Sequence, residues 1–244
     1  MMDDYRIVVP SRKRPELMQR LLALVPTATV TVEDNEMVEY GKYVPPAQLV
    51  AHPPLGNIAR IRNWIMDTFT EPCIIQMDDD FELMKCLGGA MRSLRQADDI
   101  LRVIENQVQV ATDLNIGIFG WYPSLPMVGD YFARDPFAFS KPCIGVFGCR
   151  GSARHRRFDP KSLGREDMDW TLQAVRDDRI VLCDCRYHAS VGTNEKHEGG
   201  TLGLINEKMR LAATDYLRIK WGPIIELRKA GEKQMMGRAV SRRQ

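Results

Sequence analysis

Three adjacent aspartates, Asp78, Asp79 and Asp80, follow an apolar run, CIIQM (73–77), that has the composition of a buried strand. Neighbouring carboxylates repel one another and are costly to remove from water, so their place after a buried strand needs a reason. Because side chains alternate along extended backbone, Asp78 and Asp80 are predicted to point the same way and Asp79 elsewhere. Such a pair suits Mn²⁺ or Mg²⁺, with coordination positions left for phosphates. The alternative is an acidic turn that caps the next helix.

Further polar residues follow the other apolar runs. The segment VVPSRKRP (8–15) brings Ser11, Arg12 and Arg14 after the first run, and the second run ends in Glu33 and Asp34. Cations and a metal at one sheet edge would suit a nucleotide diphosphate, and acids there would accept hydrogen bonds from a base or ribose. The alternative is that these are ordinary solvated surface residues.

A second acidic group opens the segment EDMDWTLQAVR (166–176), which has helical spacing. Glu166 and Asp167 lie in its first turn, where a carboxylate either stabilises the helix dipole or serves as a general base toward an acceptor hydroxyl. His188, after a later apolar run, is a candidate third metal ligand. Cys183 and Cys185 precede it, but a structural zinc is disfavoured because no second tight pair of ligands accompanies them.

The sequence predicts alternating strands and helices, and these elements would bring the residues named above to one edge of a sheet. Strands are predicted at 5–9, 28–33, 73–77, 116–122, 143–149 and 179–185, and helices at 15–25, 57–69, 90–113, 166–176 and 205–222. This alternation is typical of an α/β sandwich with a largely parallel sheet. Ligands of such sheets bind beyond the carboxyl ends of the strands, which is where the first acidic run lies.

The gross composition sets further bounds. The chain has 244 residues, a net charge of +2 and six cysteines, which suits a globular protein with free thiols in a reducing cytoplasm. Neither a signal peptide nor a membrane span is predicted, and no obligate protein partner is indicated. Residues 223–244 are basic and weakly patterned, so this tail is expected to fray.

The order of these motifs resembles the GT-A class of nucleotide-sugar glycosyltransferases, especially its family-two-like branch. The residues that carry the resemblance, across roughly 5–200, are Pro10 and Ser11, Glu33 and Asp34, Arg62 and Asn63, Asp78 to Asp80, Glu166 and Asp167, and a histidine after the next strand. PSRKRP, IRNWIM and MDDDF are also similar to the TET-associated glycosyltransferase group, phage enzymes that glycosylate modified DNA bases.

The resemblance implies a Rossmann-like α/β/α sandwich with a mixed, mostly parallel sheet. It implies one domain over 1–222, with a donor-binding half at about 1–115 and an acceptor and catalytic half at about 116–222. The implied metal ligands are Asp78, Asp80 and His188, and the implied base is Asp167, with Glu166 as second choice. The donor, a UDP-sugar, would contact Pro10, Ser11, Arg12, Arg14, Glu33, Arg62 and Asp79. Transfer would invert the anomeric centre.

The best acceptor on this interpretation is a hydroxymethylated pyrimidine in phage DNA. A basic segment, CRGSARHRRF (149–158), is interpreted as a phosphate track beside the base, or alternatively as a solvated loop. A saccharide or surface polysaccharide remains an alternative acceptor. A nucleotidyltransferase is less favoured because PSRKRP lacks a glycine-rich phosphate loop, and a nucleic-acid-binding accessory protein would leave the three aspartates without a purpose.

Overall fold

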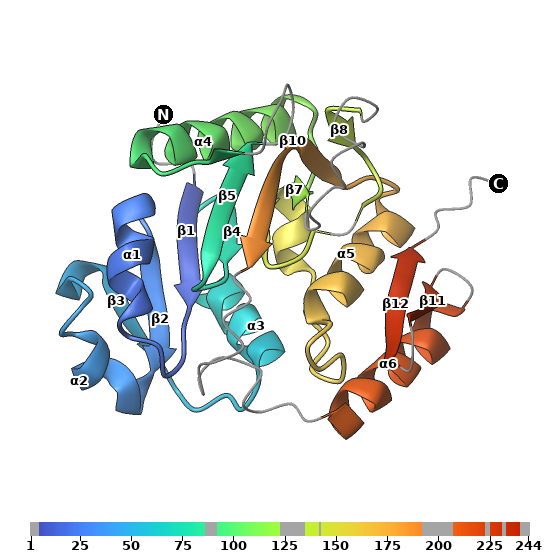
Figure 1. Cartoon of the computed structure of the whole chain (residues 1–244), viewed down its shortest axis with the longest axis horizontal. Helices are drawn as coiled ribbons and strands as arrows, with labels where there is room; N and C mark the ends of the chain where they lie inside the picture. The colour runs from blue at the N-terminus through green and yellow to red at the C-terminus, as the bar shows by residue number, and fades with distance from the viewer. Residues whose placement is uncertain are drawn as a thin grey trace.

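The protein is an α/β sandwich in which helices cover both faces of one large sheet (Figure 1). The computed structural model describes residues 5–85, 92–122, 135–141, 143–191, 207–222, 225–230 and 233–239. The strands of the large sheet are β1 (Tyr5–Pro10), β2 (Thr29–Glu33), β3 (Leu49–His52), β4 (Cys73–Met77), β5 (Phe81–Lys85), β6 (Arg92–Ser93), β7 (Ile118–Tyr122), β8 (Phe137–Ala138), β9 (Val146–Arg150) and β10 (Leu182–Val191). The helices are α1 (Leu17–Leu24), α2 (Met37–Tyr40), α3 (Ile58–Thr68), α4 (Ala97–Asp113), α5 (Glu166–Asp177) and α6 (Glu207–Trp221), and 3₁₀ turns include η1 (Asp34–Glu36), η2 (Pro46–Gln48) and η4 (Gly151–His155).

The large sheet has the order β3-β2-β1-β4-β9-β7-β10-β5-β6, and β8 pairs with β10. The strands from β3 to β4 are parallel neighbours. Across the whole described sheet, β5, β8 and β9 run against the other strands. This confirms the predicted sandwich with a mixed, mostly parallel sheet.

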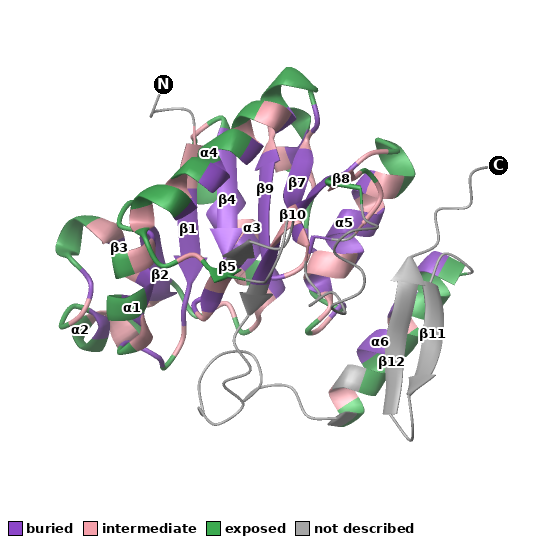
Figure 2. Ribbon diagram, turned by 45° about the horizontal axis from the view of Figure 1, so that its top comes forward, coloured by how far each residue is buried: buried purple, intermediate pink, exposed green. Residues whose placement is uncertain are grey.

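Side-chain alternation along the strands builds two cores. On β1, Ile7 and Val9 pack on the face covered by α1 and α4, whereas Val8 packs on the face covered by α3 and α5. The central strands are therefore buried on both sides while the outer helix surfaces stay exposed (Figure 2). Strands buried on both faces read as continuous apolar runs, which is why β1, β2 and β4 are visible in the sequence.

Some element bounds differ from the sequence-based expectation. The helix expected over 90–113 begins at Ala97, because residues 92–93 form β6 instead. The strand β5 was not predicted, since it directly follows the acidic run and takes its place by pairing with β10. In the tail, whose fraying stays a prediction, the described residues include two strands that the sequence did not predict, β11 (Ile225–Ala230) and β12 (Lys233–Ala239), which pair antiparallel. No described helix combines the length and apolar character needed to cross a bilayer.

Candidate active site

The carboxyl ends of three parallel strands meet at one edge of the sheet. β1 ends at Pro10, β2 at Glu33 and β4 at Met77, so the loops that follow these strands start side by side. The strand β9 runs the other way, so the loop that precedes Val146 reaches the same edge. Sequence reasoning predicted this edge as the place where the charged residues gather.

Asp79 is locked into the loop after β1. It is 8% exposed, and its Oδ2 accepts a hydrogen bond of 2.7 Å from the Ser11 hydroxyl while its Oδ1 accepts one of 3.1 Å from Arg14. The hydroxyl of Tyr40, on α2, lies 2.7 Å from Ser11 Oγ and accepts from the Arg14 amide at 3.0 Å. With both oxygens engaged, Asp79 fixes the shape of the loop, a role distinct from the donor contact expected of it.

Asp78 points to the opposite face of the sheet. Its Oδ1 accepts a hydrogen bond of 3.0 Å from Arg62, whose Nε lies 3.4 Å from Glu166. Arg62 is 2% exposed and its guanidinium stands 4.8 Å from the ring centre of Phe147. One buried cation thus joins the strand end to the start of α5, and the aromatic ring excludes water from it.

Gly145 holds the two acidic groups together through its backbone. The Asp78 amide donates to the Gly145 carbonyl at 3.1 Å, and the Gly145 amide donates to Asp167 Oδ2 at 3.1 Å. Gly145 has φ of 71°, in the left-handed region that favours glycine. The second Asp167 oxygen accepts from the Met168 amide at 2.7 Å. Asp167 is therefore oriented at the helix start and remains partly exposed, whereas Glu166 is buried.

Crowding of carboxylates perturbs the titration of this cluster. Burial raises the pKa of Asp78 to about 7, with Arg62 opposing the rise and Asp167 and Asp80 adding to it. Burial, then repulsion from Asp167, raises the pKa of Glu166 to about 7, again against the pull of Arg62. Burial disfavours the Arg62 cation, but Asp78 and Glu166 outweigh it and raise the Arg62 pKa. Shifted carboxyl groups around a buried cation are typical of functional sites.

Asp80 lies where the strand alternation ends. Asp79 and Asp80 form a turn between β4 and β5, and Asp80 Oδ2 stands 3.9 Å from the Arg14 guanidinium. The turn interrupts the extended backbone, so the side-chain direction of Asp80 cannot be inferred from that of Asp78 by strand alternation. The side chains of Asp78 and Asp80 are 31% and 13% exposed, so both retain access to solvent.

The residues at this edge fit a hard divalent cation. Mutual repulsion between Asp78 and Asp80 contributes to the raised Asp78 pKa, and a cation between them would relieve it. Among the described residues, no group of three or more His, Cys, Asp or Glu side chains is assembled to hold a metal. Asp78 and Asp80 would thus supply two carboxylates, and substrate phosphates and waters would complete the coordination of a cation such as Mg²⁺.

His188 lies on β10, further from the acidic turn. In the pairing of β10 with β5, Val191 is opposite Phe81, the residue after Asp80, whereas His188 is opposite Met84. The His188 ring is buried and its Nδ1 lies 2.9 Å from the Tyr122 carbonyl; burial lowers its pKa, against that contact, which favours a neutral imidazole. Its role as a metal ligand stays a prediction.

The remaining predicted donor contacts frame the edge. Pro10 is the buried last residue of β1, and Glu33 is half-buried at the end of β2. Arg12 is half-buried, and within the described residues no carboxylate pairs with it, so its charge is available to a phosphate. Trp121 and Trp170 are both buried in the core.

The basic segment 149–158 does not lie beside the proposed base. In the pairing of β4 with β9, Arg150 is opposite Cys73, at the other end of β4 from Asp78. Arg156 pairs with Asp177 and Asp178, at the far end of α5 from Asp167. The expected phosphate track next to the base is therefore wrong. A cavity of about 770 Å³ opens at this opposite edge, but it holds none of the carboxylates described above.

Sequence reasoning missed Tyr40 and Gly145. Tyr40 comes from a short helix with no local signal that links it to Ser11. Gly145 did carry a signal, because a glycine within an apolar strand pattern often marks a bulge or a close backbone approach.

Comparison with solved structures shows glycosyltransferases of the same fold. The Staphylococcus aureus TarS 1–349 chain in complex with UDP-GlcNAc matches with a TM-score of 0.57 and 12% identity, over 89% of this chain and 66% of that one, so this chain spans less than two thirds of it. Glucosyl-3-phosphoglycerate synthase from Mycobacterium tuberculosis, with Mg²⁺ and UDP, matches with a TM-score of 0.53 and 9% identity, over 97% and 87%. The mannosyltransferase PcManGT from Pyrobaculum calidifontis, with GDP-Man and Mn²⁺, matches with a TM-score of 0.50 and 14% identity, over 79% and 58%.

These identities are low, so the likeness establishes the GT-A fold. No curated protein matches the sequence. A family match covers most of the chain, at residues 5–200, and it includes both acidic groups and the loop after β1. The chain therefore belongs to the TET-associated glycosyltransferase family.

Proposed function

We propose that the enzyme transfers a sugar from a UDP-sugar to the hydroxyl of a hydroxymethylated pyrimidine in DNA, with Mn²⁺ or Mg²⁺ as cofactor. The observation that carries the donor half is the arrangement of Asp78 and Asp80 beside two buried arginines, Arg14 and Arg62, at the carboxyl edge of the sheet. Fold neighbours with UDP-GlcNAc, and with Mg²⁺ and UDP, support this donor class.

Asp78 and Asp80 would hold the metal, and His188 is the further candidate ligand. When bound, the cation supplies positive charge that stabilises the diphosphate leaving group. Arg12 lies in the loop after β1 with no carboxylate partner among the described residues, and would add charge at the same phosphates. Arg62 is already shared by Asp78 and Glu166, so its main effect is to hold the two carboxylates in place.

Asp167 would act as the general base. In a single displacement, the acceptor oxygen forms a bond to the anomeric carbon, the bond from that carbon to the diphosphate oxygen breaks, and Asp167 takes the hydroxyl proton. The structure favours Asp167 over Glu166 for this role because Asp167 is partly exposed and oriented by Gly145, whereas Glu166 is buried against Arg62. A single displacement inverts the anomeric centre.

The DNA acceptor rests on the family, whose description associates it with TET proteins. A hydroxymethyl group at the 5 position of a pyrimidine projects into the major groove, so it is reached with less distortion than an atom inside the base stack. The basic segment 149–158 gives this acceptor no support, because Arg150, Arg154 and Arg157 line the cavity at the opposite edge of the sheet.

The test is transfer to defined DNA. The enzyme is incubated with a panel of UDP-sugars, Mn²⁺ and duplexes containing 5-hydroxymethylcytosine, 5-hydroxymethyluracil or plain cytosine, and digested nucleosides are weighed by mass spectrometry. A mass increase of one sugar on the hydroxymethylated bases alone supports the proposal. Transfer to a saccharide acceptor without any transfer to DNA would reject the DNA acceptor and keep the donor chemistry.

A further inference from the structure

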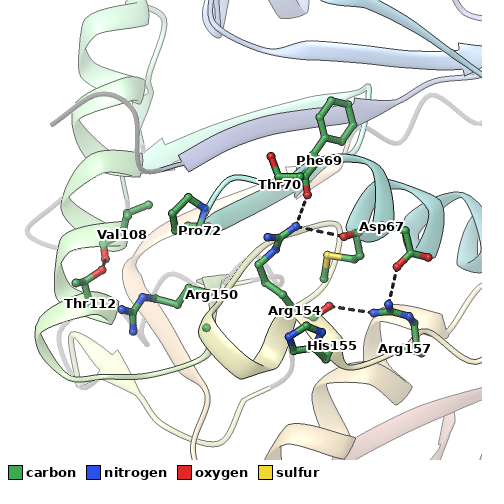
Figure 3. Close-up of a pocket in the computed structure, with 13 residues that line it drawn as sticks. Asp67, Phe69, Thr70, Pro72, Val108, Thr112, Arg150, Arg154, His155 and Arg157 are labelled. Carbon is green, nitrogen blue, oxygen red and sulfur yellow. Dashed lines mark hydrogen bonds and ion pairs between the residues drawn. The ribbon is translucent and has the colours of Figure 1, made fainter.

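A cavity of about 770 Å³ lies at the edge of the sheet opposite to the carboxylate cluster (Figure 3). Its walls come from the end of α3, the start of β4, the last turns of α4 and the start of η4. The five residues of β4 separate it from Asp78, which is roughly 15 Å along an extended strand. The cavity is therefore separate from the proposed donor site.

Positive charge dominates the cavity wall. Arg150, Arg154 and Arg157 line it, against a single carboxylate, Asp67. Arg157 pairs with Asp67, so the other two guanidinium groups keep an excess of charge. Within the described part of the chain no ion pair joins Arg150 to a carboxylate, and its guanidinium donates a hydrogen bond to the neutral amide oxygen of Asn115 at 3.5 Å.

Backbone carbonyl groups hold Arg154 in place. Its NH2 group donates to the carbonyl of Phe69 and, at 3.2 Å, to that of Met66, at the end of α3. These carbonyls fix the guanidinium but carry no full charge. The carboxylate of Glu71, which pairs with Arg6, lies near enough to Arg154 to offset part of its charge, so Arg150 is the cation of this wall with the least compensation. Figure 3 shows Arg150, Arg154 and His155 coming to the cavity from one segment of chain. Preorganised guanidinium groups are suited to phosphate because they offer paired donors in a fixed plane.

The rest of the wall is suited to the organic part of a small ligand. Apolar surface from Met66, Phe69, Pro72 and Val108 lies beside the arginines, and the volume falls within the usual range for small-molecule sites, about 300–1,000 Å³. A phosphodiester track would need only an exposed basic surface, whereas this site combines charge with a concave, partly apolar wall. We propose that the cavity binds the phosphate of a small, nucleotide-sized phosphate ester, at a site distinct from the sugar donor.

The experiment compares adenosine 5′-monophosphate with adenosine, by calorimetry on the full chain in low salt. We expect binding of the monophosphate, weak or absent binding of adenosine, and affinity about tenfold lower in Arg150→Gln, which loses one charge-assisted contact. Arg157→Gln gives a second, more exposed test of the same wall. Arg102→Gln is the matched control, since Arg102 is an exposed α4 arginine away from the cavity, and its affinity should equal that of the wild type. Circular dichroism confirms that each variant is folded.

Three outcomes would overturn the proposal. One is no binding of the monophosphate. Another is equal binding of adenosine, which would mean that the phosphate is not recognised. The third is unchanged affinity in folded Arg150→Gln and Arg157→Gln, which would place the ligand elsewhere, including at the donor site. A short single-stranded oligonucleotide is titrated in parallel, and binding of the oligonucleotide alone would identify a nucleic-acid surface and reject the small-ligand site.

Discussion

Asp78 and Asp167 are joined through the backbone of one residue, Gly145, whose carbonyl accepts from the Asp78 amide and whose amide donates to the Asp167 carboxylate. The proposed metal end of the site and the proposed base are thereby set by a single peptide segment. A shift of this segment would move both groups at once, and catalytic rates are sensitive to displacements of about 1 Å.

Gly145→Ala should lower the free energy of unfolding about as much as a control substitution at another left-handed glycine, but it should lower kcat far more than the control does. A left-handed φ costs a residue with a Cβ about 1–2 kcal/mol, and relief of this strain would turn the segment and displace Asp167. Gly222→Ala is the matched control, because Gly222 has φ of 55° and open space around it, at the end of α6. Urea denaturation and steady-state transfer rates are measured on both. Equal losses of activity in the two variants would show that backbone strain as such lowers the rate, and that the contacts of Gly145 with Asp78 and Asp167 do not matter.

Asp167→Asn should fold, bind UDP and transfer sugar about 10²–10⁴ times more slowly, which is the usual contribution of a general base. The amide keeps an oxygen for the Gly145 hydrogen bond, so the structure should be retained. If Asp167 only stabilised the helix dipole, its loss would cost about 0.3–1 kcal/mol of stability and leave the rate nearly unchanged. Transfer rates under saturating donor, together with UDP affinity, separate the two roles.

Asp79 and Asp80 are adjacent, yet their variants should fail in different ways. Asp80→Ala should abolish the gain in UDP affinity that Mn²⁺ gives over EDTA. Asp79→Asn should lower stability, because the buried Arg14 and Ser11 lose their charged partner, and should keep the response to metal. Calorimetry with and without Mn²⁺ measures both. Full metal enhancement in Asp80→Ala would remove Asp80 from the metal site.

The fold was largely readable from the sequence because its central strands are buried on both faces. The run CIIQM was predicted as a strand with the bounds that β4 has, and the start of α5 was predicted at Glu166. The alternation argument also separated Asp78 from Asp79 correctly, since β4 sends one to α3 and the other to the loop after β1. At Asp80 a turn replaces the extended backbone, so the alternation argument does not decide where that side chain lies.

What the sequence could not supply was long-range geometry. The position of segment 149–158 depends on the direction of β9, and an antiparallel β9 carries Arg150 away from the site while it brings Gly145 to it. Strand direction follows from the packing of the whole sheet and leaves no local signature. The strand β5 was missed for a related reason, because its pairing partner β10 lies about 100 residues away in the chain.

Arg62→Met should destabilise the protein by about 3–5 kcal/mol, because removal of one partner leaves buried charge uncompensated. Methionine retains much of the packing against Phe147, so the loss reports mainly on charge. The double variant Arg62→Met with Glu166→Gln should recover part of this loss, since it removes the more buried of the two carboxylates. Chemical denaturation of the wild type, the two single variants Arg62→Met and Glu166→Gln, and the double variant gives the coupling energy. Simple addition of the two single effects would contradict the proposed coupling through Glu166.

The stability of the protein without metal should fall as the pH rises from about 5 to 7. The pKa of Glu166 is about 7 in the folded protein, against an ordinary value of 4.5, and Asp78 is raised to about 7 as well. Within this window these two carboxyl groups bind more protons in the folded state than in the unfolded state, so their ionisation favours unfolding, by up to about 1.4 kcal/mol per pH unit for each proton. His188 acts in the opposite direction: its pKa is lowered in the folded protein, so its contribution to stability increases as the pH rises toward its ordinary value of 6.5 and offsets part of the fall.

Glu166→Gln should flatten this slope, because the amide does not ionise. The pKa values of Asp159 and Glu71 are lowered in the folded protein. These two carboxyl groups lose their stabilising effect only when the pH falls below their ordinary pKa, so they do not change the slope of stability between pH 5 and 7. Urea denaturation in EDTA at pH 5, 6, 7 and 8 measures the slope for wild type and variant. Asp113→Asn is the control, since Asp113 is an exposed carboxylate at the end of α4 whose removal should leave the slope intact. The decisive comparison is between wild type and variant, because both share the opposing contribution of His188. An unchanged slope in Glu166→Gln would contradict the raised pKa of Glu166 and assign the proton to Asp78 alone.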